Sequence, residues 1–386
     1  MAVYLDYAAT TPTDSKVLTA MQPFFTECFG NPSSVYSFGR KTKQAVLKAR
    51  GEIAELLGAS SEEIFFTSGG SESDNWALLG IAAANAEKGH HVITSEIEHH
   101  AVLHTVDYMR SQGFEVTVLP VDRYGFVSAD SLRNALRDDT VLVSIMMANN
   151  EVGTIQPVAE LSEIAHARGV LFHTDAVQAA GHIPIDVHAL GVDALSLSGH
   201  KLYGPKGIGA LYVRKGVDIK PLVYGGGQER GLRGGTENVP GIVGLGAASV
   251  MALNEMSDEN RRLASLRDEF ISCAAEAIEG CHLNGASGEG RLPGNINLRF
   301  DGISSESLLI RLDIAGFAVS AGSACSAGAV EPSHVLTAMG LSEAEAKSSV
   351  RITIGRYTTK KELHDFFEEL KKSVREIRLA SKPENT

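Results

Sequence analysis

The stretch ALSLSGHKLYGPKG, residues 194–207, places Lys201 just after a short apolar strand and before a Gly-Pro turn. A lysine that follows a strand is most often a solvated surface residue. An apolar strand that runs into a glycine-rich turn is, however, an unusual place for an unpartnered charge. A lysine in that setting can lose its proton and act as an amine nucleophile or form a Schiff base. This stretch alone leaves both interpretations open.

A second polar cluster, HTDAVQ at residues 173–178, puts Asp175 at the end of the preceding strand, 26 residues before Lys201. Neighbouring strands of a parallel sheet end side by side, so the two residues can face one ligand. An aspartate here could also be a simple helix N-cap. A Schiff-base lysine with an aspartate on a pyridinium nitrogen is the pair that a pyridoxal phosphate enzyme needs. The pair therefore favours that cofactor more than either residue does.

The chain around these clusters alternates short β-branched runs with helical patterns, which predicts a mostly parallel α/β sheet covered on both faces. The expected strands are 64–67, 91–94, 115–120, 141–147, 170–173, 194–198 and 209–214, and the expected helices are 74–88, 98–111, 128–137 and 158–168. After about residue 260, helices at 258–278 and 360–379 bracket strands at 294–300 and 350–354. We expect a large domain over 13–259 and a smaller α+β domain formed by 1–12 and 260–386, joined through a helix.

Composition limits the possible classes of protein. The chain has 386 residues, a net charge of −12, and 44% hydrophobic residues, as in an ordinary folded protein. The acidic balance argues against extensive direct nucleic-acid binding. Four cysteines with no CxxC pair argue against a disulfide scaffold or zinc ribbon and favour a reducing compartment. No leader is visible and the apolar runs are short of about 20 residues, so we expect a soluble, cytoplasmic protein without a membrane segment.

Further motifs carry candidate ligand-binding groups. TSGGSESD at residues 67–74 lies between a strand and a helix, where glycine N–H groups and the helix dipole suit a phosphate. It is neither a Walker loop nor GxGxxG, and such a turn is often only a turn. The stretch 225–236, GGGQERGLRGGT, is a mobile basic loop or another anion contact. His99, in EHH at 98–100, could stack on an aromatic cofactor or move protons. His100 and His104 have metal-ligand spacing, but no HExxH or partner cluster supports a metal, so we expect none.

Ten consecutive small residues surround one thiol, Cys325, in SAGSACSAGA at residues 320–329. No bulky side chain pins this tract, so we expect it to be exposed and mobile, and a cysteine there can carry a persulfide. A tightly packed turn is the alternative. Cys28, Cys273 and Cys281 are expected to be structural or incidental. Arg351 lies in an alternating strand, where it is either a clamp for a substrate carboxylate or an exposed strand arginine.

The ordered set of motifs resembles the cysteine desulfurases of the NifS/IscS type, which belong to the class-V aminotransferases among the fold-type I pyridoxal phosphate enzymes. The resemblance covers nearly the whole chain and rests on YLDYAATTP, GNPSS, FTSGGSESDN, EHHAV, ANNEVG, HTDAVQ, SGHKLYGPKGIGALYV, RGGTEN, SAGSACSAG, EPSHVL and SSVRITIGR. It implies a fold-type I large domain with a smaller α+β domain, and pyridoxal 5'-phosphate as cofactor.

The resemblance also implies a role for each matching position. Lys201 would carry the cofactor and then move the substrate's α-proton, and Cys325 would be the nucleophile. His99 would stack on the cofactor ring and help in proton transfer. The remaining cofactor contacts would come from Gly70, Ser71, Asn150, Asp175, Gln178, Ser198, His200 and Thr236. Asp175 would hold the pyridine nitrogen and Gln178 the phenolate oxygen, and the phosphate would be held by Gly70, Ser71, Ser198 and His200. Asn150 and Arg351 would hold the carboxylate of L-cysteine. Thr236 would reach the neighbouring subunit's phosphate, which implies a homodimer.

The implied reaction removes sulfur from L-cysteine, leaving L-alanine and a persulfide on Cys325 for a sulfur-acceptor protein. That acceptor would be an iron–sulfur scaffold or a tRNA thiouridylase. Ser71 replaces a frequent threonine but keeps the hydroxyl, and Tyr36 stands where relatives often have histidine. The sequence ends soon after the last helix, without the longer tail with which IscS-type members dock their scaffold, which favours a tRNA-thiolation partner or a dedicated scaffold. A different pyridoxal phosphate reaction, or a non-enzymatic sulfur or metal scaffold, is the alternative.

Overall fold

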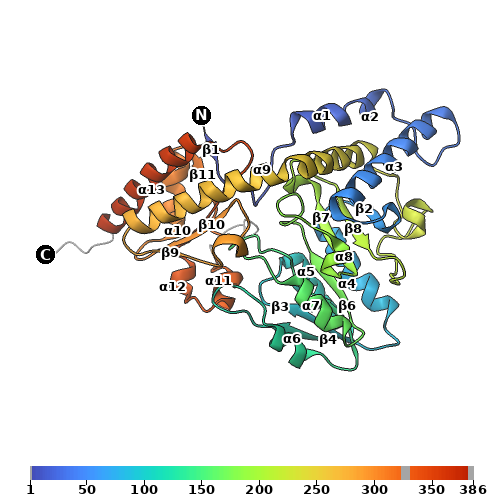
Figure 1. The fold of residues 1–386 in the computed structure, drawn as a ribbon, viewed down its shortest axis with the longest axis horizontal. Coiled ribbons are helices and arrows are strands. Elements are labelled where there is room, and N and C mark those ends of the chain that lie inside the picture. The colour runs from blue at the N-terminus through green and yellow to red at the C-terminus, as the bar shows by residue number, and fades with distance from the viewer. Residues whose placement is uncertain (1, 323–330, 381–386) are drawn as a thin grey trace.

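A seven-stranded sheet forms the centre of the computed structural model, which describes residues 2–322 and 331–380 (Figure 1). β8 is antiparallel to both of its neighbours, and the other described neighbours pair in parallel. The sheet is therefore mostly parallel, as predicted. In spatial order its strands are β2 (Ile64–Thr67), β8 (Gly209–Val213), β7 (Ala194–Ser198), β6 (Leu171–Asp175), β5 (Thr140–Ser144), β3 (His91–Ser95) and β4 (Glu115–Leu119).

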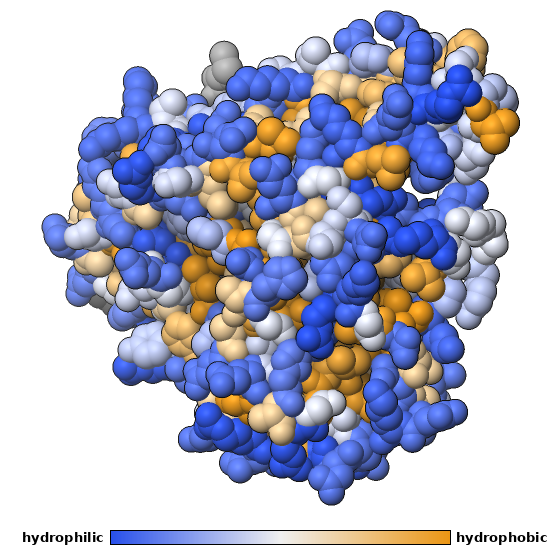
Figure 2. Space-filling model, turned by 45° about the vertical axis from the view of Figure 1, so that its right-hand side comes forward, coloured by the Kyte–Doolittle hydropathy of each residue, from blue (hydrophilic) through white to orange (hydrophobic). Residues whose placement is uncertain are grey.

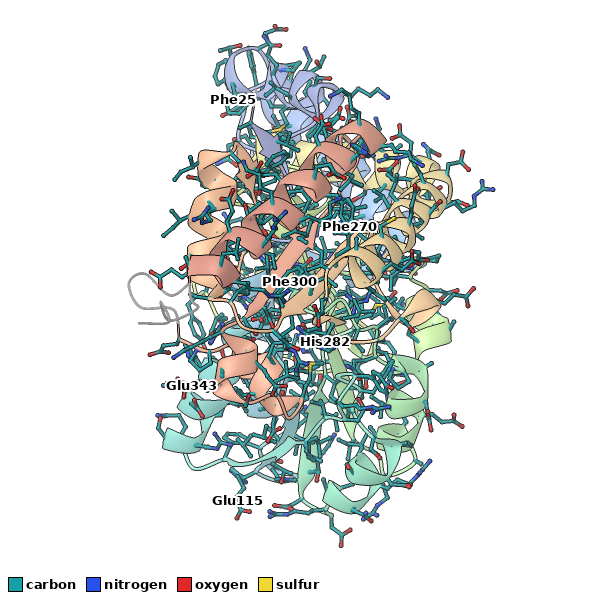
Figure 3. The ribbon with its side chains drawn as sticks, turned by 90° about the vertical axis from the view of Figure 1, so that its left-hand side faces the viewer. Phe25, Glu115, Phe270, His282, Phe300 and Glu343 are labelled. Carbon is teal, nitrogen blue, oxygen red and sulfur yellow. The ribbon has the colours of Figure 1, made fainter. Side chains whose placement is uncertain are left out.

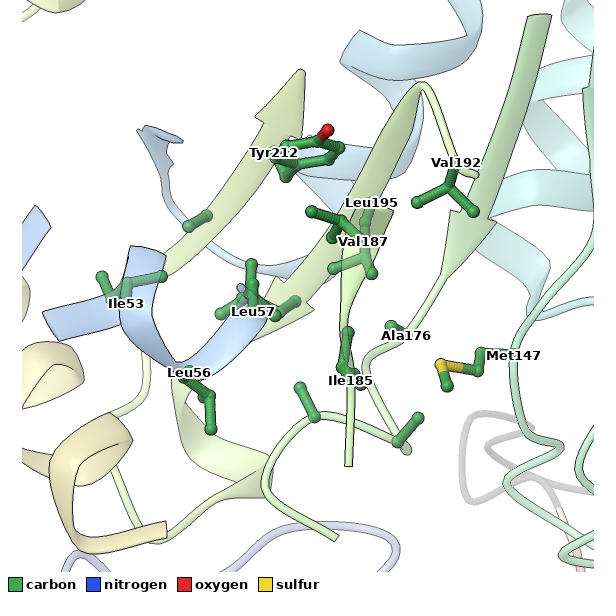
Figure 4. Packing of buried hydrophobic residues seen from close by; sticks show 14 of the residues in the cluster. Ile53, Leu56, Leu57, Met147, Ala176, Ile185, Val187, Val192, Leu195 and Tyr212 are labelled. Atoms are coloured by element: carbon green, nitrogen blue, oxygen red, sulfur yellow. The ribbon is translucent and has the colours of Figure 1, made fainter. Parts of the chain in front are cut away.

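Helices cover both faces of this sheet. Successive side chains of a strand point to opposite faces, so each face presents apolar side chains for helices to cover. In β2, Ile64 and Phe66 join the core under α3, while Phe65 packs with Trp76 of α4 on the other face. Figure 4 shows part of the first core, with Ile53 and Leu57 directed at the sheet. The covering helices are α3 (Ser37–Leu57), α7 (Val158–His166), α8 (Val187–Leu190) and α9 (Val239–Ala277) on one face, and α4 (Gly70–Ala84) and α5 (His100–Ser111) on the other.

Shorter elements complete this part of the molecule. α6 packs on α7 and β4 near the outer edge of the sheet, and α1 packs along α9. Their bounds are α1 (Ser15–Met21), α2 (Pro23–Thr26) and α6 (Ala129–Ala135).

A second, smaller core lies around a three-stranded antiparallel sheet. Figure 3 shows Phe270 and Phe300 inside it, behind α13. The sheet has the order β12 (Ser349–Thr353), β10 (Asn295–Phe300) and β9 (Cys281–Leu283), and a parallel pair joins β1 (Val3–Tyr4) to β11 (Phe317–Ala318). The helices here are α10 (Ser305–Ile314), α11 (His334–Ala338), α12 (Glu343–Ala346) and α13 (Lys360–Ala380).

One continuous helix, α9, crosses between the two cores (Figure 1). Residues 239–252 contribute to the large core, and Leu263, Phe270 and Ala274 contribute to the small one. The predicted helix at 258–278 was therefore too short at its start. The early part contains Gly244 and Gly246, which look like loop residues in a sequence. A Cβ on Gly244 would lie 2.6 Å from Met21 Sδ of α1, so these glycines permit close helix contact.

The same helix is long and apolar enough to cross a bilayer by length and composition alone. In this structure, 56% of its most apolar window is buried inside the protein, against α3 and α1. Core helices often meet the same criterion. The domain boundaries expected at residues 12/13 and 259/260 stay a prediction, and the second of them falls within α9.

Candidate active site

A cavity of about 330 Å³ opens at the carboxyl ends of the parallel strands. Ten residues singled out from the sequence line it, although they come from strands, helix starts and loops that are far apart in the chain. They are Gly70, Ser71, His99, Asn150, Asp175, Gln178, Ser198, His200, Lys201 and Arg351.

Lys201 ends a 3₁₀ turn, Gly199–Lys201, that follows directly on β7. Its Nζ donates a hydrogen bond to the carbonyl of Ala9 at 2.8 Å and another to the carbonyl of Ala8. His182 donates to the carbonyl of Lys201 itself at 2.9 Å. The N-terminal segment thus covers the lysine, and the amine lies where the sequence placed it, at the end of a buried strand.

Asp175 is the last residue of β6, the parallel neighbour of β7, and is 5% exposed. Its carboxylate accepts a hydrogen bond from the N–H of Val177 at 2.8 Å. Burial raises the pKa of Asp175 to about 6, while that hydrogen bond and the charge of Lys201 oppose the rise. The expected adjacency of Asp175 and Lys201 is therefore present in one cavity.

His99 is the N-cap of α5, and its Nδ1 accepts a hydrogen bond from the N–H of Ala101 at 3.1 Å. This bond leaves the proton of a neutral ring on Nε2. Burial, together with the neighbouring charges of His100 and Lys201, lowers the pKa of His99 to about 4. The imidazole is therefore neutral at physiological pH, as suits a ring that stacks on an aromatic ligand.

A second recess of about 490 Å³ adjoins the cavity at the start of α4 and shares Gly70, Ser71, Ser198 and His200 with it. The helix begins at Gly70, earlier than predicted, so its N-terminal N–H groups belong to the recess. A Cβ on Gly70 would lie 2.6 Å from a methyl of Val177, so only glycine fits there. Glycine and hydroxyl donors at the N-terminus of a 15-residue helix make a site for a phosphate.

The opposite wall comes from the small sheet. Arg351 of β12 is 2% exposed, and its Nη2 pairs with Asp6 at 2.9 Å while its Nη1 donates to the carbonyl of Asn150 at 3.2 Å. Its buried Nε has no hydrogen-bond partner within residues 2–322 and 331–380. Arg351 also lines the cavity, so its guanidinium is placed to meet a ligand carboxylate.

One predicted site residue among those that the structure describes, Thr236, does not join this cavity, and another, Cys325, is not described. Thr236 lines a separate recess of about 240 Å³ beside Ser68 and Gly207, so no contact with this chain's own cavity supports its expected role. Cys325, with the expected mobility of its tract, lies outside the described residues. Of the other thiols, Cys273 is exposed on α9, and burial raises the pKa of Cys281 to about 11.

The cavity wall holds Asp74, Glu151 and His334, which sequence reasoning missed, and His100, which it considered only as a metal ligand. Asp74 and Glu151 are each 1% exposed and line it, as do His100 and His334, whose ring centroids are 4.8 Å apart. Within the part of the chain that the structure describes, no group of three or more His, Cys, Asp or Glu side chains is arranged to hold a metal. Glu151 lies in the quoted motif ANNEVG, which was the one available signal for it.

The residues present fit pyridoxal 5'-phosphate: an amine for its aldehyde, a buried carboxylate for its ring nitrogen and a helix N-terminus for its phosphate. Together with the sheet topology, this donor set defines the fold-type I class of pyridoxal phosphate enzymes. Within that class the chain belongs to the aminotransferase class-V family, whose sequence profile matches residues 3–366.

Curated relatives and solved structures agree with this assignment. The chain is 55% identical to "Cysteine desulfurase IscS" of Methanosarcina thermophila, over 98% of this chain and 93% of the relative. It is 53% identical to the protein of the same name from Dictyoglomus turgidum, over 98% and 96%. A solved "NIFS-LIKE PROTEIN" superposes with a TM-score of 0.91 at 41% identity, over 97% of this chain and 100% of the other. "SspA in complex with cysteine" superposes at 0.82 with 42% identity, over 92% and 99%.

Proposed function

We propose that the chain is a cysteine desulfurase that converts L-cysteine to L-alanine and retains the sulfur as a persulfide on Cys325. The observation that carries the proposal is the convergence of Lys201, Asp175 and Arg351 in one cavity, the first two from adjacent strands and the third from the opposite wall. The relatives named above carry the same activity in their names, and one solved neighbour is titled as a complex with cysteine.

Pyridoxal 5'-phosphate, when bound, supplies an electron sink that acidifies the α-carbon of an amino acid. Gly70, Ser71, Ser198 and His200 would hold its phosphate, and the neutral ring of His99 would stack on it. Asp175 would hold its nitrogen and Gln178, whose Nε2 donates to the carbonyl of Ala8 at 3.0 Å, would lie near its phenolate oxygen. These assignments use residues that already line the cavity and its adjoining recess.

The substrate's carboxylate binds Arg351, whose guanidinium Asp6 and the Asn150 carbonyl orient. Lys201 would hold the cofactor through its amine, and the same amine, when free, would move the proton at the substrate's α-carbon as a general base. The hydrogen bonds from Lys201 Nζ to the carbonyls of Ala8 and Ala9 hold the amine inside the cavity.

The thiolate of Cys325 then attacks the substrate sulfur. A sulfur–sulfur bond forms, the carbon–sulfur bond breaks, and its electron pair stays on the substrate carbon, which takes a proton to give alanine. Described residues on both sides of the cysteine support this step. The backbone of Ser320 pairs with that of Arg351, and Ser333 Oγ donates to the carboxylate of Glu151 in the cavity wall. The chain therefore enters and leaves the cysteine segment beside the proposed substrate site.

The decisive experiment compares Cys325→Ala with Cys273→Ala, a matched removal of an exposed thiol. Cys325→Ala is expected to keep bound cofactor, seen by its visible absorption, but to form no alanine from cysteine under turnover. Cys273→Ala is expected to match the wild type. Continued desulfuration by Cys325→Ala would refute the proposal, because another group would then accept the sulfur.

A homodimer is the second part of the proposal. Apolar side chains are exposed on α2 and on the segment between α2 and α3, where Phe25 is 60%, Phe29 66% and Val35 87% exposed. Figure 2 shows apolar residues at this outer end of the molecule. A second copy would cover such a surface and bring Thr236 to its partner's phosphate. Light scattering is expected to give twice the chain mass of 41.0 kDa, and a monomer would contradict this part.

The persulfide is expected to pass to an acceptor protein of iron–sulfur cluster assembly or tRNA thiolation. A protein acceptor suits a chain whose net charge of −12 disfavours direct tRNA binding. Trapping proteins that become disulfide-linked to Cys325 during turnover identifies the acceptor. Sulfur transfer from this chain directly to purified tRNA would contradict the need for one.

A further inference from the structure

A second carboxyl group, that of Asp74, lies in the cavity wall with no role in the scheme above. It belongs to the second turn of α4 and is 1% exposed. Its Oδ1 is fully buried and has no hydrogen-bond partner in the described part of the chain. An ionised carboxylate in such a position loses its hydration without compensation, so a buried, unpartnered aspartate requires a physical explanation.

Asp74 lies in a buried group of polar side chains that includes Ser196, whose backbone pairs in register with Asp175. Ser196, which lies opposite Asp175 in the pairing of β6 with β7, hydrogen-bonds to Asp74 and contacts His173 Nε2 at 3.0 Å. His173 Nδ1 contacts Ser144 Oγ at 2.8 Å, and its Nε2 lies 3.8 Å from Asp74 Oδ1. The side chains of Asp74, Ser144, His173 and Ser196 are each at most 1% exposed, so water screens the interactions among them little.

The charges around Asp74 favour its neutral form. Burial and, next, the charge of Asp175 raise the pKa of Asp74 well above its ordinary value, while the hydrogen bond from Ser196 opposes the rise. Burial lowers the pKa of His173 to about 3, so this ring gives no positive charge to balance an ionised Asp74. Lys201 acts on Asp175 instead. This part of the cavity therefore accommodates one negative charge, and that charge lies on Asp175.

We propose that Asp74 is a positioning residue for the cofactor: as a neutral carboxylic acid it completes, with Ser196 and His173, a buried hydrogen-bonded layer that leaves Asp175 as the single negative charge available to the cofactor nitrogen. This inference rests on the proposed function, because it assigns Asp175 to that nitrogen. An ionised Asp74 would repel the charge of Asp175 and favour its protonation, which would weaken its hold on a protonated pyridine ring.

The test measures the dissociation constant of pyridoxal 5'-phosphate for the full-length protein by absorbance titration after the cofactor is removed. Asp74→Asn keeps the shape and neutrality of the protonated acid, so its constant should stay within about twofold of the wild type. Asp74→Ala removes the hydrogen bond to Ser196, and its constant should rise about tenfold, the loss of one buried hydrogen bond. Glu63→Gln is the matched control, since Glu63 is a buried carboxyl that accepts hydrogen bonds from the N–H groups of Ser60 and Lys215 and does not line the cavity.

Asp175→Asn separates this inference from the proposed function. If Asp175→Asn leaves cofactor affinity unchanged, the cofactor assignment itself fails. If Asp175→Asn weakens binding but Asp74→Ala does not, only the role of Asp74 fails. A loss in Asp74→Asn as large as that in Asp74→Ala would also overturn it, because the ionised form would then be required. Should Asp74→Ala not fold, Ser196→Ala gives the same reading: a constant like that of the wild type would refute the layer, and a severalfold rise would support it.

Discussion

The two walls of the cavity are built in different ways. The wall that holds Asp175 and Ser198 comes from adjacent strands of one sheet, and the contacts behind it, such as that of His173 with Ser196, follow from strand register. The opposite wall brings Arg351 of β12 against Asp6 and Asn150, which lie 345 and 201 residues away in the chain. The first wall is fixed when the large sheet forms, whereas the second depends on the small core packing against the large one. Cofactor binding therefore depends on the large sheet, whereas substrate binding depends on how the small core packs against the large one.

Lys201 takes part in both cofactor attachment and proton transfer at the substrate, so its removal should have the largest effect. Lys201→Ala is expected to lower alanine formation by at least about a thousandfold, since covalent attachment and proton transfer are lost together. Absorbance of the purified protein should also lack the band of a lysine-bound cofactor. Lys215→Ala, which removes an exposed lysine paired with Glu62, is the control and should match the wild type. Activity above a tenth of wild type in Lys201→Ala would show that another base acts.

Arg351 tests the second wall alone. Arg351→Gln is expected to raise KM for cysteine about thirtyfold with a smaller change in kcat, as a charged hydrogen bond to the substrate is lost. Steady-state kinetics measures the split. Arg299→Gln on the neighbouring strand, where the side chain pairs with Glu345, should leave KM unchanged. An unchanged KM in Arg351→Gln would remove this arginine from the substrate site.

The titration of Glu98 tests the first wall through the pH dependence of the free energy of unfolding. The residue is fully buried, accepts hydrogen bonds from Ser95 and Met146, and burial raises its pKa to about 8 from the ordinary 4.5. The folded chain therefore binds this proton more tightly than the unfolded chain, and its contribution to stability is lost as pH rises from 4.5 to 8. Urea denaturation should show Glu98→Gln gaining on the wild type by up to about 1.4 kcal/mol per pH unit in that window. A gap that is constant or narrows with rising pH would contradict a neutral Glu98.

Asp6 should give the smallest effect. Asp6→Asn keeps a hydrogen-bond acceptor for Arg351 but removes the charge, so KM for cysteine is expected to rise only about threefold. The same kinetic assay compares it with Arg351→Gln. An effect as large as that of the arginine variant would mean that Asp6 contacts the substrate region directly rather than orienting Arg351.

Sequence reasoning recovered the first wall far better than the second. Lys201 and Asp175 follow apolar strands, and strand ends of a parallel sheet meet by topology, so their adjacency could be predicted. Arg351 was predicted from its family motif and strand alternation, but its pairing with Asp6 required the packing of two cores. Asp74 looks like an ordinary polar residue of a helix, and only the sheet beneath α4 reveals its burial. The first half of α9 was not predicted, because Gly244 and Gly246 look like loop residues. A close contact between helices leaves no local signature in the sequence.

The shared helix α9 has a consequence for how the protein unfolds. Its 39 residues span roughly 58 Å, and opposite ends of it supply side chains to each hydrophobic core. Unfolding of either core would remove the packing from one end of α9. That end would then unwind towards the other core, and helix cooperativity opposes such unwinding. The two cores are thereby bound into one cooperative unit, which should give a single calorimetric transition rather than two.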